Sequence, residues 1–478
     1  MKTDALKVAS LVGSLLLTGC VAGPNFTTPK APEASRYTSE ALPSLSLPAQ
    51  GTSNVAVPEL WWSLFQSPKL DETVRTALSG NRSLQASQAT LQQANELLGV
   101  ARASRMPEIT GDAGAGRQKL GAAFLGGFSL PPFTYYSVGA SVSYVFGLAG
   151  GIRRTIEQQQ ALAEVQQHEL DAAHLALTGN VVLQAFAIAS ARAQIRAAEA
   201  VIEEDHRNAD LVHKAFDEGS VPRLDVLSAE SQLAQDETLM PPLRQELSVA
   251  RHALAVLVGE APGNWSAPDF ELEDFTPPAT LPVSLPSELA RKRPDIRAGE
   301  AQLHAATAAV GVATANRYPQ IKLTGSLSQQ AISVSSLFDH GSDAFSLAGG
   351  VTAPILDFGR RKSQQLAAEA AMKASQAKYE ETVLTAFRQV ADVLAALEHD
   401  AQQTEAQQRA LDVAESALAL TRESYSAGNT GVLQILDAER QVLRARIGVV
   451  RARAQRMQDT AELVVALGGD SPTVVAKN

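Results

Sequence analysis

The polar and apolar positions of this chain fall into long stretches with helical spacing. Residues 155–215 contain almost no glycine or proline and are rich in Ala, Gln, Glu and Leu. This composition predicts a helix of ~90 Å at a rise of ~1.5 Å per residue, then a turn near Gly219 and a second helix that ends near Val258. Residues 360–427 and 433–467 predict the same arrangement again. Helices this long, with Ala-rich faces, favour close side-by-side packing in coiled-coil style.

Four shorter segments alternate between apolar and polar residues with a period of two. These segments lie near residues 108–117, 138–146, 320–330 and 345–355, and helical stretches at 70–105 and 288–316 precede them in each half. Alternation over about ten residues is typical of a membrane β-strand with one apolar and one polar face, although a half-buried sheet of a soluble protein gives the same pattern. Each half therefore offers one hairpin, with residues 119–133 and 333–343 as the connecting loops.

Four strands are too few to close a barrel. In a bilayer every backbone N–H and C=O group must find a partner, so an open sheet edge is not tolerated there. If these strands lie in lipid, several chains must contribute to one barrel. Three chains would supply twelve strands, an even number within the known range.

The chain contains an internal duplication. Residues 99–107 recur as 311–319, at an offset of 212 residues. Three further pairs share an offset of 209 residues: Gly219 with Gly428, 224–232 with 433–441, and Gly259 with Gly468. A repeat of this length is too long for a solenoid unit. It indicates a duplicated half-molecule, in which one design is used twice.

These patterns predict the order of segments along the chain. The order is a leader at 1–19, an extended tether at 20–60, a first repeat at 61–275, a proline-rich linker at 276–287, a second repeat at 288–470 and a tail at 471–478. The first repeat should hold a hairpin at about 108–147 and long helices over 155–258. The second should hold a hairpin at about 320–357 and long helices over 360–467. Three aromatic residues are the expected first anchor of the tether into the folded body: Trp61, Trp62 and Phe65.

The first 20 residues have the features of a targeting segment. Lys2 and Lys7 precede an apolar run at residues 8–17, which is too short to span a bilayer. The run ends in Leu-Thr-Gly just before Cys20, the only cysteine, and this resembles a bacterial lipobox. We therefore expect Cys20 to carry covalent lipid, as diacylglycerol and an N-acyl chain, with an ordinary signal peptide as the alternative. Val21 rather than Asp follows the cysteine, which favours the outer membrane over the inner one.

Composition excludes several classes of function. The chain has 41 basic and 51 acidic residues, and without the leader its net charge is about −11, which argues against a nucleic-acid partner. A single cysteine excludes an intrachain disulfide and a zinc–cysteine site. The histidines are scattered, and no metalloprotease, serine-hydrolase or phosphate-loop motif is present. We expect no catalytic residue, no metal and no cofactor other than the lipid.

Three motifs point to a known family. They are Arg293-Pro294-Asp295-Ile296-Arg297 followed by Glu300-Ala301-Gln302-Leu303, then Pro354-Ile355-Leu356-Asp357-Phe358-Gly359-Arg360-Arg361, and Tyr425-x-x-Gly428 ahead of Leu436-Asp437-Ala438. With these motifs, the lipobox and the duplicated helix–hairpin–helix halves, the chain resembles the TolC-like outer-membrane efflux channels. Within that family it is most similar to the NodT/OprM-type lipoprotein branch, over the whole mature chain.

The resemblance implies a mainly α fold with a membrane β-barrel portion. Three copies would form a homotrimer, in which a 12-stranded barrel with four strands per chain continues into a long periplasmic α-helical barrel. The implied partners are a periplasmic adaptor (membrane fusion protein), an RND-type inner-membrane pump and outer-membrane lipid. The implied function is the exit duct of a tripartite efflux system for drugs or small molecules. The alternatives are a duct for type I protein secretion and, from a different class, a lipid-anchored periplasmic coiled-coil scaffold.

The resemblance also assigns residues to the closed periplasmic end of the tunnel. Leu433 and Asp437 are four residues apart and share a helix face, and in the OprM-like branch the matching positions form a leucine ring and an aspartate ring. Asp225 matches an acidic position near the tip in the wider family, and Tyr425 matches a residue that in TolC ties neighbouring coils together. An ordinary solvated helix residue is the alternative for either aspartate. Three glycines are expected to form the turns and to take part in adaptor docking: Gly219, Gly428 and Gly431.

Overall fold

The computed structural model describes residues 21–30, 36–38, 60–121, 126–127, 130–278 and 286–469. These residues form two compact units, and each unit combines segments of both sequence repeats. The first unit draws on the described parts of Met1–Pro29, Thr90–Gln166 and Ala298–Tyr379, and the second on those of Lys30–Ala89, Gln167–Arg297 and Glu380–Asn478. The two repeats are therefore not separate domains in space. The limits set above for the leader, tether, linker and tail remain predictions.

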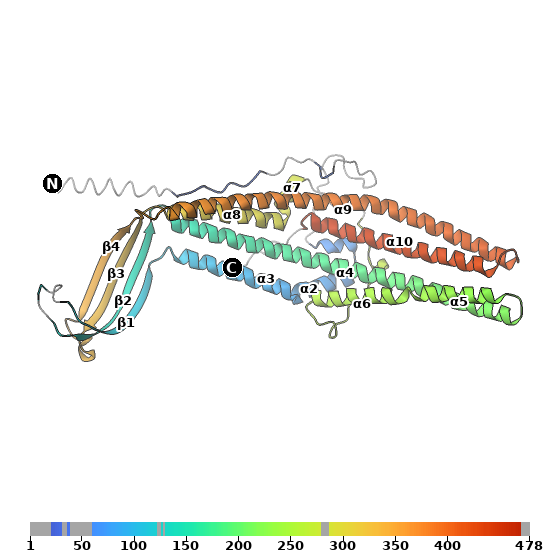
Figure 1. The fold of residues 1–478 in the computed structure, drawn as a ribbon, viewed down its shortest axis with the longest axis horizontal. Helices are drawn as coiled ribbons and strands as arrows, with labels where there is room; N and C mark the ends of the chain where they lie inside the picture. The colour runs from blue at the N-terminus through green and yellow to red at the C-terminus, as the bar shows by residue number, and fades with distance from the viewer. Residues whose placement is uncertain are drawn as a thin grey trace. The chain divides into compact units, whose positions relative to one another are not determined.

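A four-stranded antiparallel sheet belongs to the first unit. Its strands are β1 (Glu108–Gln118), β2 (Phe133–Gly147), β3 (Gln320–Ala331) and β4 (Asp343–Thr352), in the spatial order β1-β2-β3-β4 (Figure 1). Each repeat supplies one hairpin, and the pairing of β2 with β3 joins the two hairpins into one sheet. Within the described chain, β1 and β4 each have a neighbour on one side only.

The two faces of this sheet differ as the alternation predicts. Ile321 lies opposite Val351, and Leu327 lies opposite Phe345 on the same face. Leu327 and Phe345 are 66% and 83% exposed, so this apolar face is uncovered in the single chain. The other face carries a row of hydroxyl groups that crosses all four strands: Thr110, Ser141, Ser326 and Ser346. Hydrogen bonds of 2.8 Å and 2.9 Å join the first two and the last two of these side chains.

The last strand is shorter than expected. The alternation placed Ile355 in the strand and the end of the hairpin near residue 357, but β4 ends at Thr352 and Ile355 lies outside it, 98% exposed. Pro354 explains the difference, because proline has no N–H group to donate to a ladder. The connection between β3 and β4 contains a short 3-10 helix, η4 (Val334–Ser336).

Two long helices dominate the rest of the chain. They are α4 (Gly151–Asp217) and α9 (Arg360–Ser426), each of 67 residues, which corresponds to ~100 Å at ~1.5 Å per residue. By length and composition α4 contains one 18-residue stretch apolar enough to cross a membrane, although half of that stretch is buried inside the structure. Core helices can also contain a stretch of this kind, so α4 by itself is weak evidence for a membrane span.

The helix that follows each long helix differs between the repeats. The sequence predicted one continuous helix up to Val258, but α5 (Arg223–Glu237) and α6 (Met240–Leu257) are separate, whereas α10 (Val432–Ala466) is unbroken. The cause is Pro241 and Pro242, whose rings would clash with the preceding turn and which lack an N–H group. Both prolines therefore lie in the first turn of α6, where neither defect matters.

The helices that precede the strands are also broken, each at one residue. The stretches 70–105 and 288–316, predicted as single helices, are α2 (Pro68–Gly80) with α3 (Arg82–Ala103), and α7 (Pro286–Lys292) with α8 (Pro294–Ala315). Asn81 lies at the first break and donates from Nδ2 to the Leu257 carbonyl, at 2.8 Å. Arg293 lies at the second break and donates from Nη1 to the Ala466 carbonyl, at 2.9 Å. The two acceptor residues, Leu257 and Ala466, are 209 residues apart. In both repeats, the residue at the break therefore donates a hydrogen bond to the end of the last helix.

An aromatic cluster forms part of the core of the second unit. Phe186 of α4 makes edge-to-face contacts with Phe65 at 4.9 Å and with Phe275 at 4.8 Å between ring centroids. Phe65 belongs to η1 (Trp61–Phe65), and Trp61 donates from Nε1 to Thr178 Oγ1 at 3.2 Å. All three aromatic residues of η1 are at most 5% exposed, which confirms that this segment anchors the chain to the folded body.

Candidate functional site

The long helices end in turns of the same geometry in both repeats. Gly219 has a φ of +74°, its N–H donates to the Phe216 carbonyl at 2.9 Å, and the next N–H donates to the Ala215 carbonyl at 2.8 Å. Gly428 has a φ of +76° and makes the same pair of bonds, with the Tyr425 carbonyl as the first acceptor. This is the Schellman arrangement, which satisfies carbonyls at the end of a helix and requires a left-handed residue. Tyr425 thus contributes its backbone to the turn, and its side chain is 47% exposed.

Replacing Gly428 by alanine tests this geometry. A side chain at Gly428 would meet no atom within 4 Å, so the cost arises from the left-handed backbone alone, and we expect about 1–2 kcal/mol of lost stability. Thermal denaturation followed by circular dichroism measures the loss. Gly431→Ala is the matched control, because the φ of Gly431 is −92° and alanine adopts it readily; its Cβ would lie 3.2 Å from Oε1 of Gln434, at the end of a side chain. Equal destabilisation by the two substitutions would contradict the assignment.

The helices after the turns begin differently in the two repeats. Gly431 precedes α10 and donates its N–H to Gln434 Oε1 at 3.0 Å. In the first repeat Pro222 takes the place of Gly431, and Asp225 takes the place of Gln434. Because proline has no N–H group, the Asp225 carboxylate has no equivalent donor to accept from. Asp225 lies partly exposed in the first turn of α5, where the positive end of the helix dipole favours a carboxylate.

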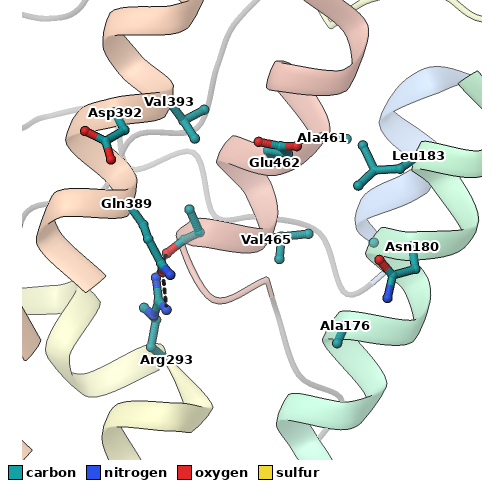
Figure 2. A pocket seen from close by; sticks show the side chains of 12 residues that line it. Ala176, Asn180, Leu183, Arg293, Gln389, Asp392, Val393, Ala461, Glu462 and Val465 are labelled. Carbon is teal, nitrogen blue, oxygen red and sulfur yellow. Dashed lines mark hydrogen bonds between the residues drawn. The ribbon is translucent and has the colours of Figure 1, made fainter. Parts of the chain in front are cut away.

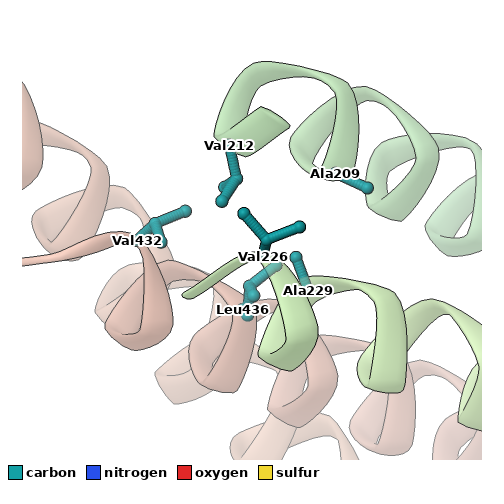
Figure 3. Packing of buried hydrophobic residues seen from close by; sticks show 6 residues of the cluster. All are labelled: Ala209, Val212, Val226, Ala229, Val432 and Leu436. Atoms are coloured by element: carbon teal, nitrogen blue, oxygen red, sulfur yellow. The ribbon is translucent and has the colours of Figure 1, made fainter. Parts of the chain in front are cut away.

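A small apolar cluster holds the two helical hairpins together near these turns. It joins α4, α5 and α10 and consists of Ala209, Val212, Val226, Ala229, Val432 and Leu436 (Figure 3). Val226 is fully buried at its centre, and Phe216 and Val221 pack against it from the first turn. The cluster therefore joins the hairpin of α4 and α5 to α10, which forms the second hairpin with α9.

The structure places Leu433 and Asp437 away from this cluster. Their neighbours on α10, Val432 and Leu436, are 9% and 5% exposed, whereas Leu433 is 39% exposed and the Asp437 side chain is 56% exposed. Asp437 forms an ion pair with Arg440, one turn further along the helix. The helix thus has one face that packs within the chain and another that presents a leucine and a carboxylate to the outside.

A group of buried carboxylates just behind the apolar cluster was not expected from the sequence. Asp205 of α4, Asp236 of α5 and Glu439 of α10 are 2%, 6% and 5% exposed. Burial and a hydrogen bond with Asp236 raise the pKa of Asp205 to about 8, with further repulsion from Asp236, Glu439 and Glu204. Burial and the neighbouring carboxylates therefore favour the protonated form of the Asp205 carboxyl in the folded chain. No local pattern could reveal it, because the three acids come from three helices.

Two amides and one arginine complete this group. Gln232 donates to Asp236 Oδ2 at 2.7 Å, and Asn208 donates to Glu439 Oε2 at 2.6 Å. Arg422 of α9 forms an ion pair with Glu439 at 2.7 Å. Arg422 thus balances the charge of Glu439, and a proton on Asp205 reduces the negative charge that remains.

A second pair of carboxyl groups lies between α9 and α10, with Asp459 buried and Asp400 half-buried. Burial and a hydrogen bond with Asp459 raise the pKa of Asp400 to about 7, in spite of the nearby Arg456. Asp459 also accepts from Gln455 Nε2, at 3.1 Å. Among the residues described, no group of three or more His, Cys, Asp or Glu side chains is arranged to hold a metal ion.

The motif that begins at Arg293 has a structural explanation. Arg293 is 8% exposed and borders a cavity of about 440 Å³ between α4, α9 and α10 (Figure 2). It donates to Asp295 Oδ1 and Oδ2 at 3.0 Å and 2.7 Å and to Gln389 Oε1 at 2.7 Å, besides the Ala466 carbonyl. The arginine and aspartate of the motif thus fix the corner between α7 and α8.

The predicted lipidation residue, Cys20, lies outside the described residues, which begin at Val21. The predicted turn and gate residues lie together at one end of the second unit, on α4, α5, α9, α10 and their connections. The sequence therefore identified a region that is continuous in space, but it missed the carboxylates buried behind it.

Comparisons with known proteins agree with this architecture. The chain matches the model of the family "Outer membrane efflux protein" over residues 73–260 and 285–469. It is 27% identical to the probable outer membrane lipoprotein SilC of Salmonella typhimurium, over 97% of this chain and 98% of that protein. It is 30% identical to the pyoverdine export outer membrane protein OpmQ of Pseudomonas aeruginosa, over 97% of each chain. The solved outer-membrane channel OprN is similar in structure, with a TM-score of 0.86 and 28% identity over 94% of this chain and 99% of that one.

Two hairpins in one sheet, joined to paired long helices in each of two repeats, define the class of outer-membrane channels. The chain belongs to the outer membrane efflux protein family. It is an outer-membrane transport duct that extends into the periplasm and works with an inner-membrane pump and an adaptor, and it is not an enzyme. The resemblance to TolC-like channels and the mainly helical fold with four strands per chain are confirmed.

Proposed function

We propose that three copies of this chain assemble into one channel, with a 12-stranded barrel in the outer membrane and a helical tunnel in the periplasm. The observation that carries the proposal is the four-stranded sheet, in which β1 and β4 have no partner on their outer edges among the described residues and one apolar face is exposed. Backbone groups cannot remain unpaired in hydrocarbon, so β1 of one copy must pair with β4 of the next. Three copies then give twelve strands, an even number in the known range.

Electron microscopy of the full chain, extracted in mild detergent, tests this assembly. We expect a threefold tube with a detergent belt at one end. Phe345→Lys should reduce the membrane-inserted assembly, because a charge on the lipid-facing side costs roughly 2–4 kcal/mol at the bilayer midplane. Ser346→Lys is the matched control on the opposite face. Single copies without a belt would overturn the assembly of three copies and the placement of the strands in lipid.

Covalent lipid on Cys20 is a further part of the proposal. The lipobox before Cys20 supports it, as does the name of SilC, a probable outer membrane lipoprotein. Intact-mass measurement of the mature protein should show a chain that begins at Cys20 and carries diacylglycerol and N-acyl groups. A mature chain with an unmodified N-terminus would rule out this anchor.

The exposed face of α10 suits a constriction of the tunnel. In a trimer, Leu433 would form an apolar ring and Asp437 a ring of three carboxylates, which repel each other and attract cations. Asp225 and Tyr425 lie beside the same turns and belong to the same gate. The turns themselves are the proposed docking site of the adaptor, through three glycines: Gly219, Gly428 and Gly431.

The cargo that fits this proposal is a drug or another small molecule delivered by an RND-type pump. OpmQ, which shares 30% identity over 97% of each chain, is named for pyoverdine export. Deletion of the chain should lower resistance to small toxic molecules and leave protein secretion unchanged. Loss of a secreted protein instead would favour the type I secretion alternative.

A further inference from the structure

The first described residues of the chain lie against the junction between the sheet and the helices of the first unit. Ala22 donates its N–H to the Ala149 carbonyl at 3.0 Å. A side chain on Gly150 would come within 3.3 Å of the Val21 backbone. Both contacts involve the turn between β2 and α4. We call residues 21–26 the strap.

Arg154, in the first turns of α4, is the main polar partner of the strap. Its side chain is 3% exposed. It donates from Nε to the Ala22 carbonyl at 3.0 Å and from Nη2 to Asn25 Oδ1 at 2.7 Å, with a longer contact of 3.4 Å to the Gly23 carbonyl. Glu157 balances the charge through an ion pair of 2.8 Å. Without the strap, the guanidinium would lose these three acceptors and would keep, among the described residues, the Glu157 carboxylate.

The helices around Arg154 are shaped to admit the strap. Gly23 has a φ of +86°, and a side chain there would come within 2.5 Å of the Gly311 Cα on α8. A side chain on Gly311 would come within 2.8 Å of Arg154. The two glycines therefore let the strap cross α8 at backbone contact distance while the arginine reaches it.

An aromatic contact fixes the far end of the strap. The ring of Phe26 stacks on the ring of His304 of α8, with centroids 4.4 Å apart and an interplanar angle of 16°. His304 Nε2 lies 3.2 Å from Glu157 Oε1, so the same glutamate orients both the arginine and the histidine. Residues from α4 and α8 thus hold both ends of the strap.

Among the described residues, the second repeat has no arginine at the position equivalent to Arg154. Gly150 and Gly359, which are 209 residues apart, both have a positive φ just before their long helices. At the same offset, the position equivalent to Arg154 is Ser363. Arg154 is therefore present in the first repeat, whose α4 contacts the strap.

We propose that Arg154 and the α4–α8 surface around it form a docking site for the segment directly after the lipid-bearing cysteine, and that Arg154 is the residue that positions the lipid anchor. The inference rests on the proposed lipidation of Cys20. Val21 follows Cys20 directly and touches the turn between β2 and α4. The proposed lipid is therefore attached one residue away from the end of the sheet at which α4 begins. Acyl chains attached there enter the leaflet that this end of the sheet faces. The lipid and the apolar face of the sheet then fix the depth of the protein in the membrane together. A free tether would leave the position of the lipid relative to the sheet undefined.

Hydrogen exchange on the full lipidated protein tests the docking site. The Ala22 amide and its neighbours should be protected in the wild type. In Arg154→Ala we expect exchange of the strap to be about tenfold faster or more, since charge-assisted hydrogen bonds are lost. Arg153→Ala is the matched control, because Arg153 is the adjacent residue on α4 and is exposed. Arg154→Lys keeps the charge without the forked geometry and should restore the protection only in part.

The following results would contradict the docking site or the lipid anchor. Protection of the strap that survives in Arg154→Ala, or that is lost equally in Arg153→Ala, overturns the docking site. If Arg154→Ala loses its helical circular dichroism, Asn25→Ala replaces it, since this change removes an acceptor of the strap and leaves the ion pair with Glu157 intact. The mass of the N-terminal residue is measured on each sample. A protected strap behind an unmodified Cys20 would remove the lipid anchor and its positioning by Arg154, and would leave only the docking of the segment.

Discussion

The double substitution Leu433→Ala with Asp437→Ala is expected to open the resting channel. Both side chains lie on the exposed face of α10, next to the turn that ends α9. Truncation of both removes an apolar ring and a ring of three carboxylates from the narrowest part of the proposed tunnel, and the apolar cluster behind them remains intact. We expect a severalfold rise in single-channel conductance in planar bilayers. Cells that carry the variant should also become sensitive to large antibiotics that the outer membrane normally excludes.

The duplication supplies a matched control for this experiment. Leu224 and Ser228 occupy the positions of Leu433 and Asp437 in the first repeat, at the offset of 209 residues. Leu224 is 66% exposed, so its truncation costs little packing. Leu224→Ala with Ser228→Ala should leave the conductance close to that of the wild type. An unchanged conductance in the first double variant, or an equal rise in both, would remove Leu433 and Asp437 from the gate.

The stability of the second unit is expected to fall as pH rises from about 4 to about 8. The folded protein keeps a proton on Asp205, whose pKa is raised from 3.8 to about 8, while the unfolded chain releases that proton near its ordinary pKa. The folded state therefore binds more protons in this interval, and its stability is fully present below the lower value and lost as pH approaches the higher one. The raised pKa of Asp400, about 7, acts in the same direction. Denaturation midpoints measured from pH 5 to pH 9 should decrease and then level off.

Asp205→Asn separates this effect from other titrations. Asparagine stays neutral at every pH and can still donate to Asp236, so the variant should show a flatter dependence on pH. At pH 8 we expect it to exceed the wild type in stability by more than about 1.4 kcal/mol, the value of a single pH unit by which a pKa is raised. Asp210→Asn, an exposed position on the same helix, is the control. Parallel curves for the wild type and Asp205→Asn would show that Asp205 is charged in the fold.

The residues of the proposed gate could be selected from the sequence because the features that mark them are local. A glycine followed by a helix start recurs at one offset, and a leucine and an aspartate four residues apart must share a helix face. The structure added which face of α10 packs inward and which remains exposed. That division depends on α5 and α4, which contact α10 through the apolar cluster and through Asn208.

The sequence by itself determined the duplication, the long helices, the alternating strands and the glycine turns. Each follows from spacing within one segment or from the backbone conformation that one residue type permits. Only the tertiary structure decided that β2 pairs with β3, that Asp205 shares a buried site with Glu439, and that Arg154 holds the strap. These contacts join residues far apart in the chain, so their free energies depend on burial and charge that no local pattern contains. The same arginine or aspartate on an exposed helix face would have an identical local sequence and no such role.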